Sequence, residues 1–342
     1  DGNGTVGNGG AIFSWSADID CKDLTKQVKF DGNTANASGG GIYANGGTFK
    51  LSSAIFTNGT ATNHDASAVY IQGGCKMTME SGTMTGGKAL NGWGGAIHLK
   101  GASTLDIKQC NISNNQAGNK GGAIYIGEGS TLTIDNGEIT GNTAAQKGGG
   151  VFIDGTKDNP CSFTMNNGKI NNNTATKFYG GGVNILCSNF TMNGGEINGN
   201  KAGSYGGGIF FDNMGTDDGG SNPKTFIFQN GSISNNVSGS HGGGICIYGG
   251  NGGTDAQPQT VYLKKGTISG NTAVDGGGIY MNGWNKCILN MENTTVENNT
   301  AYVGAGMLFH YSILKYNNGL IRYNRAISRA SKSAPSTMNR TR

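Results

Sequence analysis

Charge, arginine and long apolar runs are scarce in this sequence. Only 13% of the 342 residues are charged, and all five arginines lie at or after Arg322. Residues 1–321 therefore lack the basic surface that nucleic-acid binding requires. No apolar run approaches the roughly 20 residues of a membrane-spanning helix. We expect neither a nucleic-acid partner nor a membrane span in this chain.

Catalytic signatures are missing as well. The four histidines are scattered, and no zinc-protease, serine-hydrolase or phosphate-loop motif occurs. Seven cysteines cannot all pair within one chain. Of these, Cys161 and Cys187 fall on neighbouring repeats one step out of phase, so a bridge between them stays open. We therefore expect no enzymatic activity, no catalytic residues and no cofactor.

Glycine, in contrast, is abundant and periodic. Its 64 copies include a marker of the form Gly-Gly-(Gly/Ala)-(Ile/Val), usually followed by an aromatic residue. The marker begins at Gly9, Gly39, Gly94, Gly121, Gly148, Gly180, Gly206, Gly242 and Gly276, with degenerate copies at Ala66 and Gly304. Periods of 20 to 50 residues indicate a solenoid or a propeller.

The unit that begins at Gly121 shows what each repeat contains. Three short runs alternate apolar with polar residues, around Ile124, Leu132 and Ile139, and Gly, Asn and Asp separate them. This is the pattern of strands. Such a unit cannot bury its apolar side alone, whereas stacked copies share one core. A propeller blade needs four antiparallel strands in about 40 residues, which is longer than most of these units.

The sequence therefore predicts an all-β fold, a right-handed parallel β-helix of about eleven coils with three short strands per coil. We place this repeat domain in residues 1–326. Residues 327–342 contain four basic residues and no acidic ones, and we expect a basic tail that is disordered or docks onto a partner.

A second marker places an Asn three residues after an apolar residue. Identical amides on successive coils can hydrogen-bond along a stack, so we expect a structural ladder. Its members are Asn33, Asn115, Asn142, Asn173, Asn200, Asn236, Asn271, Asn299 and Asn324.

The aromatic position of the first marker lies between two core positions, so strand alternation turns it outward. We expect either an exposed stripe that binds a partner or rings that stack and are covered by loops. The candidate stripe is Phe13, Tyr43, Tyr70, Tyr125, Phe152, Phe210 and Tyr280.

Insertions concentrate in one turn of the repeat, in residues 154–160, 212–224 and 249–259. Loops on one edge of a rigid scaffold often carry function. Asp212, Asp217 and Asp218 are weak candidates for calcium ligands, because no fixed ligand spacing accompanies them. Solvated turn residues are the simpler interpretation.

The paired markers resemble the GGAI and FxxN repeats of the chlamydial polymorphic outer membrane protein family. The resemblance rests on GGAIF at Gly9, GGAIH at Gly94, GGAIY at Gly121 and FDGN at Phe30. In most repeats of this chain Ile replaces Phe in the second marker. The resemblance implies a surface-exposed β-helix with an adhesive role.

We therefore expect an extracellular or cell-surface structural or adhesive β-helix. Its partners would be a host or neighbouring-cell surface protein or a glycan, and its coils could join end to end into a homo-oligomer or filament. The alternative is a carbohydrate-active β-helix that binds glycans or cleaves them as a lyase or hydrolase.

Overall fold

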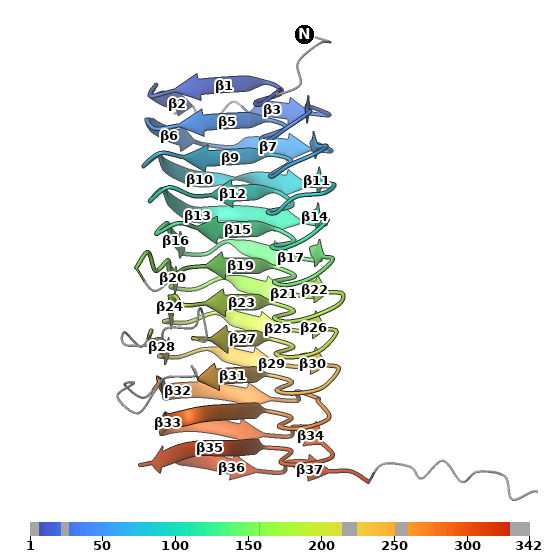
Figure 1. Cartoon of the computed structure of the whole chain (residues 1–342), viewed down its shortest axis with the longest axis vertical. Helices are drawn as coiled ribbons and strands as arrows, with labels where there is room; N and C mark the ends of the chain where they lie inside the picture. Colours follow the sequence, from blue (N-terminus) through green and yellow to red (C-terminus); the bar gives the residue numbers. More distant parts are fainter. Residues whose placement is uncertain (1–6, 22–26, 157, 214–223, 250–258, 329–342) are drawn as a thin grey trace, which may run out of the picture.

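A computed structural model describes residues 7–21, 27–156, 158–213, 224–249 and 259–328. All regular elements in these ranges are β-strands. The strands form a rod of stacked coils that runs from the N-terminal to the C-terminal end (Figure 1). Eleven successive first strands mark eleven coils, as predicted. The described residues contain no helix that could cross a membrane.

Four columns of strands make up the rod. The first contains β1 (Ile12–Trp15), β5 (Ile42–Asn45), β9 (Val69–Gln72), β12 (Ile97–Leu99), β15 (Ile124–Gly127), β19 (Val151–Asp154), β23 (Val183–Leu186), β27 (Ile209–Asp212) and β31 (Ile245–Gly249). The second contains β2 (Ile19–Cys21), β6 (Thr48–Leu51), β16 (Thr131–Ile134), β20 (Ser162–Met165), β24 (Asn189–Met192) and β28 (Phe226–Phe228).

The third column contains β3 (Val28–Asp31), β7 (Ala54–Thr57), β17 (Glu138–Thr140), β21 (Lys169–Asn171), β25 (Glu196–Asn198), β29 (Ser232–Ser234) and β36 (Gly319–Arg322). Five longer strands span more than one column: β10 (Lys76–Thr85), β13 (Thr104–Ser113), β32 (Thr260–Ser269), β33 (Ile279–Glu297) and β35 (Met307–Tyr316).

A fourth, two-residue strand follows the Asn of the second marker. It recurs as β4 (Thr34–Ala35), β8 (Thr60–Ala61), β11 (Lys88–Ala89), β14 (Gln116–Ala117), β18 (Thr143–Ala144), β22 (Thr174–Ala175), β26 (Lys201–Ala202), β30 (Val237–Ser238), β34 (Thr300–Ala301) and β37 (Arg325–Ala326). Three strands per coil were predicted; this fourth strand was not, because two residues are too few to show alternation.

Each strand pairs in parallel with the same strand of the next coil. Ile124 lies opposite Val151, and Leu132 lies opposite Phe163. Equivalent positions of the repeat therefore stack into columns, which confirms the predicted register. The last strand, β37, ends at Ala326, and nearly all of the predicted tail lies outside the described residues.

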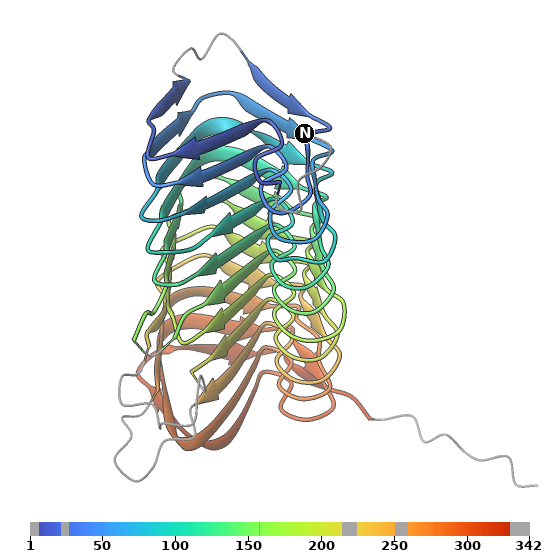
Figure 2. The same cartoon turned by 45° about the horizontal axis from the view of Figure 1, so that its top comes forward.

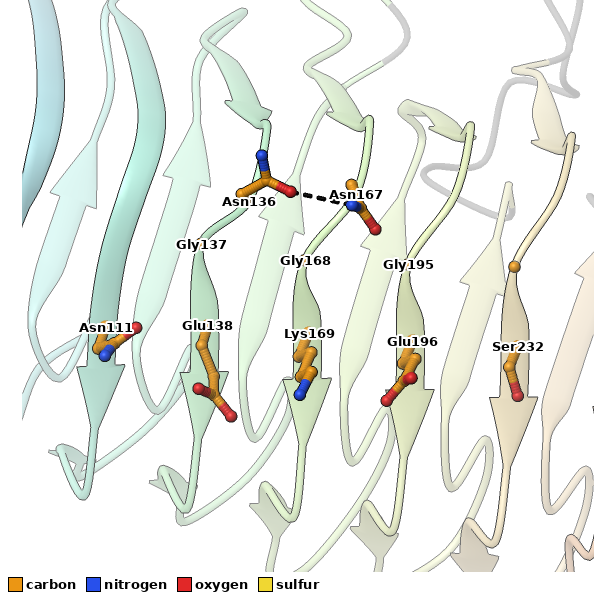
Figure 3. Close-up of a pocket in the computed structure, with 11 residues that line it drawn as sticks. Asn111, Asn136, Gly137, Glu138, Asn167, Gly168, Lys169, Gly195, Glu196 and Ser232 are labelled. Carbon is orange, nitrogen blue, oxygen red and sulfur yellow. Dashed lines mark hydrogen bonds between the residues drawn. The ribbon is translucent and has the colours of Figure 1, made fainter.

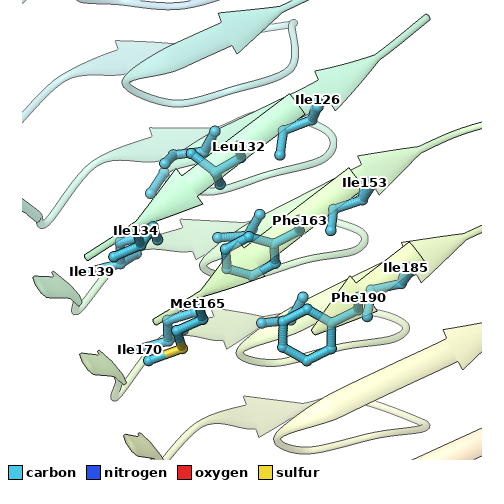
Figure 4. Packing of buried hydrophobic residues seen from close by; sticks show 14 of the residues in the cluster. Ile126, Leu132, Ile134, Ile139, Ile153, Phe163, Met165, Ile170, Ile185 and Phe190 are labelled. Carbon is cyan, nitrogen blue, oxygen red and sulfur yellow. The ribbon is translucent and has the colours of Figure 1, made fainter. Parts of the chain in front are cut away.

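One continuous core fills the rod. In Figure 4 the apolar side chains of neighbouring coils lie one above another, as in the series Leu132, Phe163 and Phe190. All seven cysteines are free thiols, so Cys161 and Cys187 are not bridged. Burial raises the pKa of the Cys75 thiol to about 12, and a thiol held protonated is a poor nucleophile. The buried cysteines therefore act as small apolar side chains.

Candidate functional site

The candidate aromatic stripe lies outside the core, but most of it is not exposed. Rings on successive coils stack, with centroids 4.9 Å apart for Tyr43 and Tyr70 and 5.7 Å apart for Tyr125 and Phe152. Tyr70, Tyr125, Phe210 and Tyr280 are 3–5% exposed, and Phe152 is completely buried. Only Phe13, on the first coil, is largely exposed, at 56%. Of the two arrangements expected, rings that stack and are covered by loops hold for most of these residues, and the exposed stripe is wrong for them.

Loops that precede the glycine marker cover these rings. In Figure 2 they form a second column beside the strands. The residue just before the marker reaches over the stripe: Trp93 stacks on Tyr125 at 4.8 Å, and His241 stacks on Tyr280 at 4.4 Å. The Lys120 ammonium lies 4.8 Å from the Phe152 ring. Sequence reasoning missed this covering position, although its aromatic and lysine residues recur at a fixed offset from the marker.

His98 occupies the aromatic column between Tyr70 and Tyr125. Its side chain is fully buried, and its Nδ1 lies 3.4 Å from Asp65 Oδ2 without hydrogen-bond geometry. Burial, with the nearby Lys100 charge, lowers the pKa of His98 from 6.5 to about 3. Burial also raises the pKa of Asp65. His98 is therefore neutral at physiological pH and packs like the tyrosines that flank it.

The asparagine ladder is present from Asn115 to Asn324. The Oδ1 of Asn173 accepts from both the backbone N–H and the Nδ2 of Asn142, at 2.9 Å each. Asn173 Nδ2 in turn donates to Asn200 Oδ1 and to the Ile139 carbonyl. From Asn115 to Asn299, each amide therefore bonds both the coil before it and the coil after it. Asn33 is separated from this ladder, because the equivalent residues of the next two coils are Gly59 and Gly87.

Most of the second and third insertions lies outside the described residues. Asp217 and Asp218 lie outside the described residues, and Asp212 ends β27. Among the residues that the structure describes, no group of three His, Cys, Asp or Glu side chains could hold a metal ion.

A polar groove crosses the third column of strands in the middle of the rod. Its volume is about 480 Å³. Figure 3 shows a row of side chains at equivalent positions on β13, β17, β21, β25 and β29: Asn111, Glu138, Lys169, Glu196 and Ser232. A second row, with Asn136 and Asn167, forms the opposite wall, and Asn167 Nδ2 donates to Asn136 Oδ1 at 2.9 Å.

Glycines form the floor of the groove, at Gly137, Gly168, Gly195 and Gly231. The last three have positive φ, and a Cβ on Gly195 would lie 2.5 Å from the Gly168 carbonyl oxygen. Side chains are excluded from this position because the backbone of the preceding coil lies too close and because φ is positive. The floor therefore stays open between the two polar walls.

The charged row of the groove alternates in sign. Lys169 is flanked by Glu138 on one coil and by Glu196 on the next. Within the described part of the chain none of these three side chains makes a hydrogen bond or an ion pair. Their donors and acceptors therefore face solvent, where a hydroxyl-rich ligand can use them.

Comparison with known families agrees with this geometry. Residues 8–166 match the family model of the right-handed beta helix region. The chain is a right-handed parallel β-helix. No curated protein and no solved structure matches it.

The matched segment of this β-helix covers the first coils and part of the groove, up to β20. Glu138 lies inside it, whereas Lys169 and Glu196 belong to later coils with the same strand register. The groove is therefore a product of the repeat itself. Its chemistry comes from the residues that each coil places at one outward position.

Proposed function

We propose that this β-helix is an extracellular or cell-surface adhesive protein that binds a glycan in the groove between Asn136 and Ser232. The single observation that supports this is the open trough on a glycine floor, walled by amides, carboxylates and Lys169. Amide and carboxylate groups suit the hydroxyls of a sugar, since each amide both donates and accepts. Parallel strands about 4.8 Å apart place one polar side chain of this row on each coil, so an extended oligosaccharide meets a polar contact on every coil that it crosses.

Binding without cleavage is the role that the groove chemistry favours. A general acid in glycoside hydrolysis needs a carboxyl group whose pKa is raised by an apolar or like-charged environment. Glu196 is exposed and Glu138 is half-buried, and Lys169 lies between them. The groove is lined by Asn, Gly, Glu, Lys and Ser residues, so neither carboxyl group has the apolar surroundings that such an acid requires. We therefore propose that both carboxylates accept hydrogen bonds from the ligand.

A glycan array probed with the 342-residue chain tests the proposal. The double variant Glu138→Ala, Lys169→Ala is expected to lose binding at least tenfold, because each lost charged hydrogen bond is worth about 1.5–3 kcal/mol. The control, Lys76→Ala with Glu80→Ala, removes the same residue types from the exposed face of β10 and should bind like the wild type. Equal binding by all three proteins would refute the groove as the site.

Hydrolysis is the second candidate, because Glu138 and Glu196 are two strands apart, about 10 Å. Inverting glycosidases place their carboxyl groups roughly 6.5–9.5 Å apart. Release of reducing sugar from a bound glycan, abolished by both Glu138→Gln and Glu196→Gln, would establish this activity and replace the adhesive proposal.

A further inference from the structure

The charged row of the polar groove has its three charges at one position of the repeat. Glu138, Lys169 and Glu196 each begin a strand of the third column, and each pairs in register with the next. The residue that follows each of them is a buried isoleucine, so strand alternation turns all three charged side chains outward. Adjacent parallel strands are about 4.8 Å apart. The row therefore presents charges of alternating sign at intervals of one strand along the rod (Figure 3).

These three charges are not neutralised by partners in the ranges that the structure covers. Elsewhere in the rod, opposite charges on neighbouring coils do pair: Lys108 Nζ lies 2.8 Å from Asp135 Oδ2. In the described ranges no side chain makes such an ion pair, or a hydrogen bond, with a charged group of the groove. A ligand therefore does not have to break an ion pair within the protein before it binds them.

The rest of the groove lining carries no charge. Asn111 and Ser232 occupy the row on either side of the three charged residues, and the other lining residues are asparagines and glycines. The row is therefore a negative, a positive and a negative group, bounded by neutral ones. Interfaces bind most specifically when the potentials of the two partners are complementary. The complementary ligand carries a positive, a negative and a positive group in that order.

We propose that the glycan of this groove is a polymer of alternating charge, in which amino sugars alternate with acidic sugars. This inference rests on the proposed glycan binding and names the class of glycan. In an extended chain, successive sugar rings lie about one strand spacing apart. The ammonium groups of two amino sugars then lie opposite Glu138 and Glu196, and the carboxylate of the acidic sugar between them lies opposite Lys169.

The same row disfavours glycans that carry a single kind of charge. A chain of amino sugars places an ammonium group against Lys169, and a chain of acidic sugars places carboxylates against both glutamates. Like charges in contact raise the free energy of a complex. A neutral chain avoids this repulsion but pairs with none of the three charges. The order of the signs, and not the net charge, therefore selects the ligand.

The amide wall of the groove adds contacts that do not depend on the charge of the ligand. Asn167 Nδ2 donates to Asn136 Oδ1 at 2.9 Å. The donors of Asn136 and the acceptor of Asn167 can then bond sugar hydroxyls. Glycans of every charge share these contacts, so a difference in affinity between them reports on the charged row.

Four hexasaccharides, titrated calorimetrically into the 342-residue chain at mildly acidic pH, test the proposal. Hyaluronan carries only carboxylates, chitosan carries only amino groups, and chitin is neutral, whereas N-deacetylated hyaluronan alternates amino and acidic sugars. The alternating glycan should bind at least tenfold more tightly than the other three at low salt. This advantage should disappear near 1 M salt, where the Debye length is about 3 Å.

The outcomes separate this inference from glycan binding itself. Equal affinities, tightest binding of another of the four, or binding of none of them would overturn the alternating ligand. Glycan binding as such fails only if the glycan array also shows no ligand.

Charge reversal in the groove tests the order of the signs directly. Lys169→Glu gives the row three like charges, so it should weaken binding of N-deacetylated hyaluronan at least tenfold and strengthen binding of chitosan. Adding Glu138→Lys and Glu196→Lys inverts every sign and should restore the lost binding, because an alternating chain can shift by one sugar. Lys76→Glu, at an exposed lysine outside the groove, is the control and should bind like the wild type. An inverted row that does not restore binding would overturn the proposal.

Discussion

Each buried amide of the ladder satisfies backbone groups that no strand pairing reaches. Asn200 accepts the Asn173 backbone N–H, and its Nδ2 donates to the Ile170 carbonyl at 2.8 Å. The Asn173 N–H lies in the turn before the fourth strand, and the Ile170 carbonyl belongs to β21, the strand that leads into this turn. A buried donor or acceptor without a partner costs about 1–3 kcal/mol. Asparagine is needed here because its short side chain carries both an acceptor oxygen and an NH2 group with two donors.

Asn200→Ala is expected to lower the free energy of unfolding by about 2–5 kcal/mol, because several buried groups lose their partner at once. Urea unfolding followed by circular dichroism measures the change. Asn193→Ala, in the same coil, removes an exposed amide that bonds Asn166 at 2.8 Å, and should change stability by less than about 0.5 kcal/mol. Equal effects of the two substitutions would contradict a structural role for the ladder.

His98 should make stability depend on pH. Its folded pKa, about 3, lies below the ordinary value of 6.5, so protons bind the unfolded chain preferentially. The contribution of neutral His98 to the free energy of unfolding is fully present above about pH 6.5. It falls by roughly 1.4 kcal/mol per pH unit as the pH drops towards 3. Compared between about pH 7 and pH 5, the free energy of unfolding of His98→Phe should fall by about 2 kcal/mol less than that of the wild type. Parallel pH profiles for the two proteins would show that His98 does not titrate on unfolding.

At the scale of the strands, the register was predictable because the repeat gives one column to each position. The core columns and the ladder from Asn115 onward follow directly from the two markers. The contact of Trp93 with Tyr125 could not be derived from the markers. Alternation decides which side of a strand a ring faces, but it does not say which loop residue packs over that ring. The groove could not be predicted for a related reason. In the sequence, a glycine such as Gly195 that lines a groove looks the same as a glycine in a turn.

Gly195→Ala should therefore be more harmful than an alanine at an unobstructed glycine. Gly74 also has positive φ, 72°, but a Cβ there meets nothing within 4 Å. Gly74→Ala is expected to lower the free energy of unfolding by about 1–2 kcal/mol, the conformational cost alone. Gly195→Ala adds the contact with the Gly168 carbonyl and should lose about 1–3 kcal/mol more. Similar losses would indicate that the backbone shifts to make room at the groove floor.

At the scale of the molecule, each coil contacts only its neighbours, so whole coils should be removable. Deleting residues 121–147 joins Lys120 to Gly148 and brings Asn115 next to Asn173 in the ladder. The shortened chain should keep the β-sheet circular dichroism spectrum with a modest loss of stability. Deletion of residues 121–134 removes half a coil and puts the columns out of phase, so this variant is expected to be insoluble or unfolded. A folded half-coil deletion would contradict the stacking register.

The backbone hydrogen bonds between coils run along the rod, because the strands lie across it. A pulling force applied to the two ends is therefore parallel to these hydrogen bonds. It breaks the bonds of one coil at a time, whereas a shearing force would load many bonds together. An anchored molecule under load would lengthen in small steps, each releasing the contour of a single repeat. The packed core makes such a rod stiff against bending, whereas under tension it unfolds coil by coil.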